Sequence, residues 1–87
     1  MTRYEVLLSE TARKRLERLP SDLKEHIKDK LTGLYNDPYH PRPKADIKKL
    51  KGPDRDYYRL RIGDYIAIYV VEKQNVKVAK ILHRSKA

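Results

Sequence analysis

The stretch IKKLKGPDRDYYRLRIGDYIAIY, residues 47–69, decides the fold of this chain. Apolar and polar residues alternate in 57–62 and again from Tyr65 onward, which is the period of a half-buried β-strand. Gly63-Asp64, between these two runs, is typical of a tight two-residue hairpin turn. Such a turn pairs Ile62 with Tyr65, so we expect the apolar side chains to form one continuous face across both strands.

The same register gathers two arginines on the opposite face of the hairpin. Arg59 and Arg61 alternate with Tyr58, Leu60 and Ile62, so their side chains point away from the predicted core. Two guanidinium groups side by side on a sheet are either solubilising charges or part of an anion-binding site. The flanking basic segment at residues 48–51 favours the second interpretation.

Length and composition exclude several classes of protein. A chain of 87 residues is enough for one small domain, which we expect to span residues 1–87. The chain has no cysteine, and its three histidines lack metal-ligand spacing, so we expect no metal and no cofactor. No apolar run approaches the roughly 20 residues of a membrane span, and the N-terminus lacks a signal-peptide pattern. We therefore expect a cytoplasmic protein with no membrane partner.

The net charge of +9 is concentrated in one half of the chain. Residues 1–41 contain eight Lys or Arg against seven Asp or Glu, and residues 42–87 contain thirteen against five. The excess positive charge therefore accompanies the arginine hairpin. This asymmetry predicts a polyanionic partner, most simply a nucleic acid. The alternative is a basic protein without such a partner.

The first half of the chain predicts a strand followed by two helices. Residues 4–8 (YEVLL) are β-prone, and Ser9 can cap the N-terminus of the helix that follows. Pro20 ends this helix. A second helix begins at Ser21 and carries an amphipathic stripe formed by Leu23, Ile27, Leu31 and Leu34. The proline-rich segment 37–46 then predicts an extended connector, in which Tyr39 and His40 pack locally or, alternatively, stack on bases.

The last predicted strand, 76–82, has two possible phases relative to the hairpin. Pairing Val71 with Val76 through a simple four-residue loop would bury Lys80, and burying an unpaired ammonium group is costly. We therefore expect a bulge or an odd-length loop near Asn75, which places Lys80 opposite Ile66. In that phase Ala79, Ile81 and His83 lie on the core side, and Val78, Lys80, Leu82 and Arg84 face the arginines.

These elements predict an α+β fold in the order βααβββ. An antiparallel twisted sheet would carry the N-terminal helical hairpin on one face. The other face would be basic and open, with an apolar strip formed by Ile66, Ile68, Val70 and Leu82. Tyr58, Tyr65 and Tyr69 would be core aromatics on the helix-covered face.

The order and spacing of several short motifs resemble the RelE branch of the RelE/ParE toxin superfamily, over essentially the whole chain. These motifs are K-K-L-K-G, Y-Y-R-L-R-x-G-D-Y, I-x-Y-x-V and the final V-x-x-I-L-H-R. The resemblance implies a RelE-like fold and an mRNA endonuclease that cuts codons in the ribosomal A site. It also implies a RelB-like antitoxin as partner, together with contacts to mRNA and ribosomal RNA.

The resemblance carries a set of site residues onto this chain. The catalytic positions match Arg59, Arg61, Lys51 and Arg84, and the RNA's own 2′-hydroxyl is the implied nucleophile, without a metal. Arginine suits this chemistry because it binds phosphate oxygens bidentately and stays charged, but its pKa above about 12 makes it a poor base. Candidates for the base are Lys51, Lys80 and His83. Further RNA contacts are predicted for Lys48, Lys49, Lys80 and His83.

Two departures from the family pattern leave the activity open. Active relatives commonly carry arginine after the hairpin tyrosine, where this chain has Ile66, and Lys80 opposite it would restore the charge. Family members usually carry a tyrosine beyond the H-R motif that stacks on or protonates the substrate, and this sequence has none up to Ala87. Tyr57 is a candidate for that role. The alternatives are a ParE-like toxin that poisons DNA gyrase without catalysis, and a RelE homologue with weakened or lost cleavage.

Overall fold

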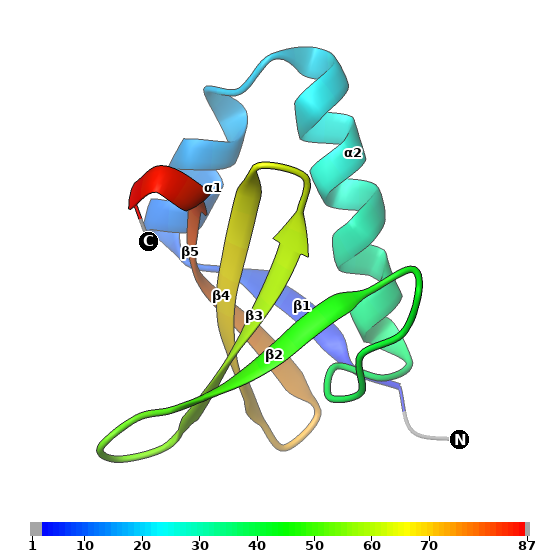
Figure 1. Ribbon diagram of the computed structural model, residues 1–87, viewed down its shortest axis with the longest axis vertical. Helices are drawn as coiled ribbons and strands as arrows, with labels where there is room; N and C mark the ends of the chain where they lie inside the picture. Colours follow the sequence, from blue (N-terminus) through cyan, green and yellow to red (C-terminus); the bar gives the residue numbers. More distant parts are fainter. Residues whose placement is uncertain (1–2, 87) are drawn as a thin grey trace.

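The computed structural model describes residues 3–86 and contains two helices against one five-stranded sheet (Figure 1). Residues 1–2 and 87, at the ends of the predicted domain 1–87, lie outside the described residues. The elements in chain order are β1 (Glu5–Leu8), α1 (Glu10–Glu17), α2 (Ser21–Thr32), the 3₁₀ turn η1 (Gly33–Tyr35), β2 (Asp46–Lys51), β3 (Asp56–Ile62), β4 (Tyr65–Glu72), β5 (Asn75–His83) and the 3₁₀ turn η2 (Arg84–Lys86). No helix within this range is long and apolar enough to cross a membrane.

The α+β class and the helical hairpin on one face are confirmed, but the sheet differs from the prediction in two respects. Residues 46–51 form an additional edge strand, β2, which pairs antiparallel with β3. The sheet order is β1-β5-β4-β3-β2, and β1 runs parallel to β5, so the sheet is mixed rather than antiparallel. The long connection between β1 and β5, which contains both helices and the other three strands, makes this parallel pairing possible, because parallel neighbours need a long crossover.

Ser9 caps α1 as predicted, since its hydroxyl accepts a hydrogen bond of 3.0 Å from the Ala12 N–H. The apolar sides of the two helices, including Leu16 and Ile27, pack on Leu60, Tyr69 and their neighbours in a single core. In Figure 1 both helices lie on the same side of the sheet, and the loop between β2 and β3 projects away from them. The fold therefore leaves one sheet face without helices.

The register of the β3–β4 hairpin is as predicted. Ile62 pairs with Tyr65, Leu60 with Ala67 and Tyr58 with Tyr69. Gly63 has a φ of +59°, a conformation that glycine adopts at no steric cost. The turn residue thus fixes the register, and the register places Tyr58, Leu60 and Ile62 of β3 on the helix-side core.

The β4–β5 register differs from the prediction. Val71 does pair with Val76, and the phase changes only farther along, at a bulge opposite Ile68 and Tyr69. Val78 before the bulge lies in the core rather than beside the arginines. Ala79 occupies the bulge and is half-buried instead of lying in the core. The bulge turns Lys80 outward as expected, but opposite Ile68 rather than Ile66.

Ser9 also holds this bulge in place. Its N–H donates to the Val78 carbonyl at 2.9 Å, and its hydroxyl donates to the Ala79 carbonyl at 2.7 Å. An extra residue in a strand leaves backbone groups without ladder partners, and Ser9 satisfies one of them. The helix cap and the strand bulge are thus a single feature.

The proline-rich connector packs locally. The buried hydroxyl of Tyr69 donates to the Pro38 carbonyl at 2.7 Å. Tyr39 lies edge-on to both Tyr4 and Tyr58, with ring centroids 6.1 and 5.4 Å apart. This aromatic packing supports the local role of Tyr39 rather than base stacking.

Candidate nucleic-acid interface

One row of side chains across the sheet concentrates positive charge on the face without helices. Lys48 of β2 pairs with Arg59 of β3, Arg59 with Ile68 of β4, and Ile68 with Lys80 of β5. Side chains paired in this way lie on the same face. Three cations and one isoleucine therefore lie in one row, in the order Lys48, Arg59, Ile68 and Lys80. We call this set the basic row.

Arg59 is the central cation of the basic row, and its guanidinium has no anionic partner among residues 3–86. Its Nε is buried and makes no hydrogen bond within the described part of the chain. Leaving a buried charged donor unpaired costs more than a typical hydrogen bond contributes. Arg59 also lines a shallow hollow together with Tyr57, Lys80 and Lys86. An anion entering this hollow would satisfy the free donor.

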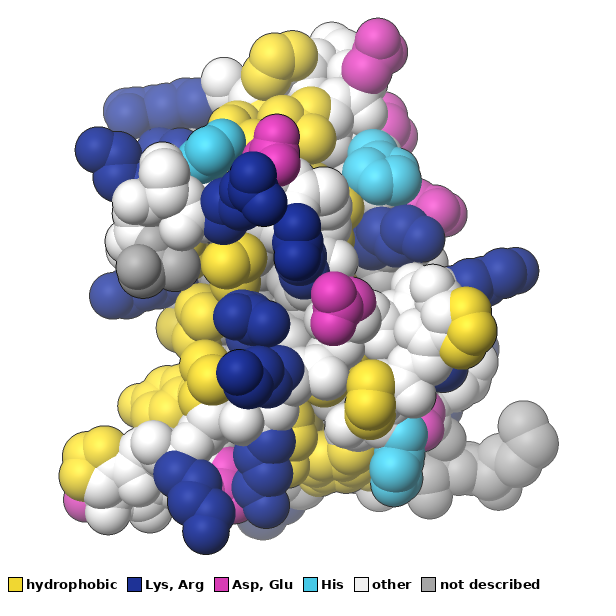
Figure 2. Space-filling view, viewed as in Figure 1, with side chains coloured by type: hydrophobic (Ala, Val, Ile, Leu, Met, Phe, Trp, Pro, Cys, Tyr) yellow, Lys and Arg dark blue, Asp and Glu magenta, His cyan; other side chains and the backbone are white. Residues whose placement is uncertain are grey.

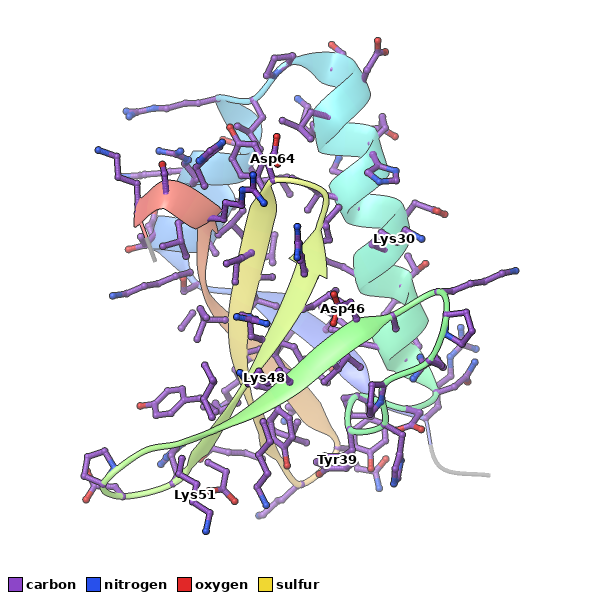
Figure 3. All side chains as sticks on the ribbon, in the orientation of Figure 1. Lys30, Tyr39, Asp46, Lys48, Lys51 and Asp64 are labelled. Carbon is purple, nitrogen blue, oxygen red and sulfur yellow. The ribbon has the colours of Figure 1, made fainter. Side chains whose placement is uncertain are left out.

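Arg61 and Arg84 lie outside the basic row, toward the β3–β4 turn. Arg61 Nε donates to the Gly63 carbonyl at 3.2 Å. The backbone N–H of Arg84 donates to the Asp64 carbonyl at 2.8 Å, and its Nε lies 3.5 Å from a carboxylate oxygen of Asp64. Figure 3 labels Asp64 at this turn, and Figure 2 shows Lys and Arg side chains following one another from here along the sheet. Arg61 and Arg84 therefore both lie at this turn, and Arg59 lies on the same face of β3 as Arg61.

Ile66 pairs with Arg61 on this face, as predicted, and is only 5% exposed. The residue opposite it on β5 is Leu82. Lys80 therefore does not compensate for Ile66, because it stands one row farther along the sheet, beside Arg59. The row through Arg61 carries less positive charge than the basic row.

Lys49 and Lys51 belong to the opposite side of β2. Both have the strand parity of Ile47, which is 5% exposed and lies in the helix-side core. Lys49 Nζ lies 3.1 Å from a carboxylate oxygen of Asp56, and the hydrogen bond between them raises the pKa of the Lys49 ammonium group. Lys51 is exposed at the end of β2, next to the projecting loop (Figure 3). The lysine of β2 that stands beside the arginines is Lys48.

His83 also lies away from the basic row. It pairs with Tyr65, and the two rings meet edge-on with centroids 5.3 Å apart. The Ser85 N–H donates to His83 Nδ1 at 3.2 Å, so the neutral ring carries its proton on Nε2. The lone pair of Nδ1 therefore already accepts a hydrogen bond, which makes the His83 ring poorly placed to act as a base.

The sequence pattern named Tyr57 only as a candidate for the missing tyrosine, and the structure places it on the open face. It pairs with Leu50 and has the same strand parity as Arg59, so alternation alone places both on one face. It lines the hollow of Arg59 and also a second hollow bordered by Leu7, Val70 and Ala79.

The basic residues beside the second hollow are neutralised. Arg55 and Lys77 lie 3.2 and 2.7 Å from the carboxylate of Glu72. The hydrogen bond from Lys77, followed by the charges of Lys77 and Arg55, lowers the pKa of the exposed Glu72 carboxyl. The two neighbouring hollows are both lined largely by apolar side chains and differ in their charges: Arg59 and Lys80 have no ion pair within residues 3–86, whereas Arg55 and Lys77 are paired with Glu72.

Comparisons with known proteins give a consistent result. Residues 6–87 match the family described as ParE toxin of type II toxin-antitoxin system, parDE. The chain is 33% identical over 79 residues to "Toxin RelE3" of Methanocaldococcus jannaschii, covering 91% of this chain and 89% of that protein.

Two solved structures are similar over nearly the whole chain. A chain of the archaeal RelE-RelB complex from Pyrococcus horikoshii OT3 superposes with a TM-score of 0.81 at 34% identity, covering 100% of both chains. A chain of the RelB-RelE antitoxin-toxin complex from Methanococcus jannaschii gives a TM-score of 0.73 at 31% identity, covering 92% of both.

Proposed function

The chain belongs to the RelE/ParE superfamily of toxins from type II toxin-antitoxin systems, and from that premise we propose that it is a ribosome-dependent mRNA endonuclease. Its substrate would be the mRNA codon in the ribosomal A site, and its effect would be to stop translation. Two relatives that the chain matches carry RelE names, which supports this branch of the superfamily.

The basic row carries the proposal. The RNA 2′-hydroxyl would attack the adjacent phosphorus, form a 2′,3′-cyclic phosphate and release the 5′-oxygen of the next nucleotide, which takes up a proton. Negative charge increases on the non-bridging oxygens during this attack. Arg59 Nε makes no hydrogen bond within residues 3–86, and a guanidinium already in place where charge develops would stabilise the transition state. Lys48 and Lys80 flank this position in the same row.

Arg61 and Arg84 would hold the neighbouring part of the RNA backbone. Their contacts to Gly63 and Asp64 fix them near the β3–β4 turn, and each keeps further N–H donors. In this assignment the cations bind and stabilise charge, and none of the arginines acts as a base, because a guanidinium does not lose its proton near neutral pH. Lys49, Lys51 and His83 have no direct role at the phosphate.

We further propose that a RelB-like antitoxin covers the open face. The solved relatives are RelE-RelB complexes, and the open face combines free cations with Ile66, Ile68 and Leu82. An acidic partner with an apolar helix or strand would complement both features. Covering the basic row would block access of RNA.

A non-catalytic toxin acting on DNA gyrase is the second candidate function. The observation in its favour is Ile66, which lies beside Arg61 and can neither bind phosphate nor move a proton. The matched family is also described by its ParE members. In this case the basic face would bind a partner without cutting RNA.

An assay with translating ribosomes distinguishes the two candidate functions. The protein is incubated with them, and the 5′ ends of the mRNA are mapped. We expect cuts within A-site codons, reduced about 100- to 1,000-fold by Arg59→Ala, the typical loss for one such donor, and strongly reduced by Arg61→Ala or Arg84→Ala. Arg13→Ala is the matched control, because it also removes one arginine, but from the exposed pairs with Glu10 and Glu17 on α1. Intact mRNA together with gyrase-dependent DNA breaks would instead establish the second candidate.

A further inference from the structure

The tyrosines of this chain differ in what surrounds their rings. Six of the seven have an aromatic ring or a cation against them within the described residues: Tyr4, Tyr35, Tyr39, Tyr58, Tyr65 and Tyr69. Tyr57 has neither in that part of the chain, and its hydroxyl makes no hydrogen bond there. It is only partly buried. Its ring is thus the aromatic surface of the molecule that no other ring or cation occupies.

Tyr57 stands at the border between the two hollows of the open face. The cationic hollow contains Arg59 and Lys80, and the apolar hollow contains Leu7 and Val70. Tyr57 and Arg59 are two residues apart on one strand, so their side chains leave the sheet about 7 Å apart on the same face. One nucleotide spans such a separation. A phosphate at Arg59 could therefore have its adjoining nucleoside at Tyr57.

The backbone at Gly52 lies close to one edge of the Tyr57 ring. A Cβ atom at position 52 would lie 2.9 Å from Cε1 of that ring and 2.7 Å from the Arg55 carbonyl oxygen. Both separations are too short for any side chain, so the glycine lets the backbone pack against one edge of the ring. A ring held at its edge does not need to be ordered when a ligand binds, which lowers the entropic cost of binding.

We propose that Tyr57 is a stacking platform for an unpaired RNA base next to the phosphate site, an assignment that rests on the proposed RNA-binding function. Stacking on an aromatic ring tolerates any base, because every base has a π-face. The platform would therefore position the RNA without reading its sequence. The apolar hollow beyond the ring, where Glu72 neutralises Arg55 and Lys77, receives the outer edge of the base.

A binding experiment tests the platform without requiring cleavage. The chain has no tryptophan, so Tyr57→Trp introduces a single fluorescent reporter. The probe is a single-stranded RNA hexamer with 2′-O-methyl groups, which removes the nucleophile, titrated at low salt because phosphate contacts weaken with salt. We expect quenching of the fluorescence by the hexamer and much less quenching by the same backbone without bases. Tyr39→Trp is the control, and we expect no quenching there, because Tyr39 packs against Tyr4 and Tyr58.

Equal quenching by the hexamer and by the abasic backbone would overturn the proposal, as would the absence of quenching at Tyr57→Trp. Because the probe cannot be cut, a protein that fails to cleave mRNA on ribosomes can still show the base-dependent signal. Failure of the nuclease proposal and failure of the platform are therefore distinguishable.

Ribosomal cleavage by two further variants separates the ring from its hydroxyl. Tyr57→Phe keeps the ring, and we expect it to lose far less activity than Tyr57→Leu. Tyr57→Leu keeps apolar volume against Gly52 but has no π-face, and we expect KM to rise roughly 5- to 150-fold. Unfolding curves verify that both variants fold. Loss of activity in Tyr57→Phe equal to that in Tyr57→Leu would assign the effect to the hydroxyl and overturn the platform.

Discussion

On the helix-covered side of the sheet, the central aromatic groups have partners, whereas on the open face Tyr57 and Arg59 lack comparable partners within residues 3–86. Tyr69 beneath the helices stacks on Tyr58 and donates to the Pro38 carbonyl. Tyr57 on the open face has no comparable partner, and Arg59 has a buried donor with none. The difference teaches where binding can occur, because a ligand gains free energy only from groups that the fold has not already satisfied.

Two adjacent residues of β3, Arg59 and Leu60, give the largest expected difference between the two faces. Leu60 is fully buried against the helices, and Arg59 faces the other way. Leu60→Ala creates a cavity, so we expect the free energy of unfolding to fall by about 2–5 kcal/mol. Arg59→Ala removes an unpaired charge, so we expect a change below about 0.5 kcal/mol or a gain, together with the loss of cleavage. Urea denaturation of both variants measures these changes. A large destabilisation by Arg59→Ala would mean that this arginine serves the fold.

The two central tyrosines give a second contrast. Tyr69→Phe leaves the buried Pro38 carbonyl without its donor, so we expect a loss of about 1–3 kcal/mol in unfolding free energy. Tyr57→Phe removes a hydroxyl that makes no hydrogen bond within residues 3–86, so we expect almost no change. The denaturant midpoints of the two variants, measured under the same conditions, test this difference. Equal losses in the two variants would remove the distinction between the faces.

Ser9 links the two faces, because it caps α1 and holds the bulge that turns Lys80 outward. Ser9→Ala removes both hydrogen bonds of the hydroxyl, and we expect a loss of about 0.5–2 kcal/mol. We also expect faster amide hydrogen exchange around Ala79 and weaker cleavage. Ser21→Ala is the matched control, since α2 begins without a side-chain cap. Unchanged exchange at the bulge in Ser9→Ala would show that the strand keeps its shape without the hydroxyl.

The smallest expected effect is a pH dependence at Asp37 in the proline-rich connector. Burial favours the neutral carboxyl, but hydrogen bonds from the Tyr39 and His40 backbone N–H groups and from the His40 ring outweigh it and lower the pKa. A depressed pKa in the folded state means that the stabilisation is present above the unfolded pKa of about 3.9 and is lost as the pH falls through the folded pKa. We expect unfolding free energy to fall on acidification below about pH 4, with a smaller fall in Asp37→Asn. Identical acid profiles for both proteins would exclude this role.

Much of the candidate site follows from local sequence patterns. The alternation in residues 57–62 and the turn at Gly63 fix which side chains share a face, because a strand has a period of two. Arg59 and Arg61 on one face and Leu60 in the core follow from that pattern alone. The resemblance to RelE toxins rests on the same residues, and the comparisons confirm the superfamily.

The bulge in β5 could not be read from its own strand. The carbonyl of Ala79 is satisfied by Ser9, a residue 70 positions away, and that contact exists only once β1 has paired parallel to β5. The prediction from the local sequence around Asn75 was therefore right that Lys80 faces outward, but wrong about the residue opposite it on β4.

The sequence by itself determined the hairpin, the excess of positive charge and the identity of the arginines on its outer face, because these depend on neighbours along one strand. The tertiary structure determined which lysines lie on the same face as these arginines. Lys48 and Lys80 stand beside Arg59, whereas Lys49 and Lys51 lie on the other side of β2. This choice depends on pairing between strands that are distant in sequence, so only the assembled sheet determines which cations meet.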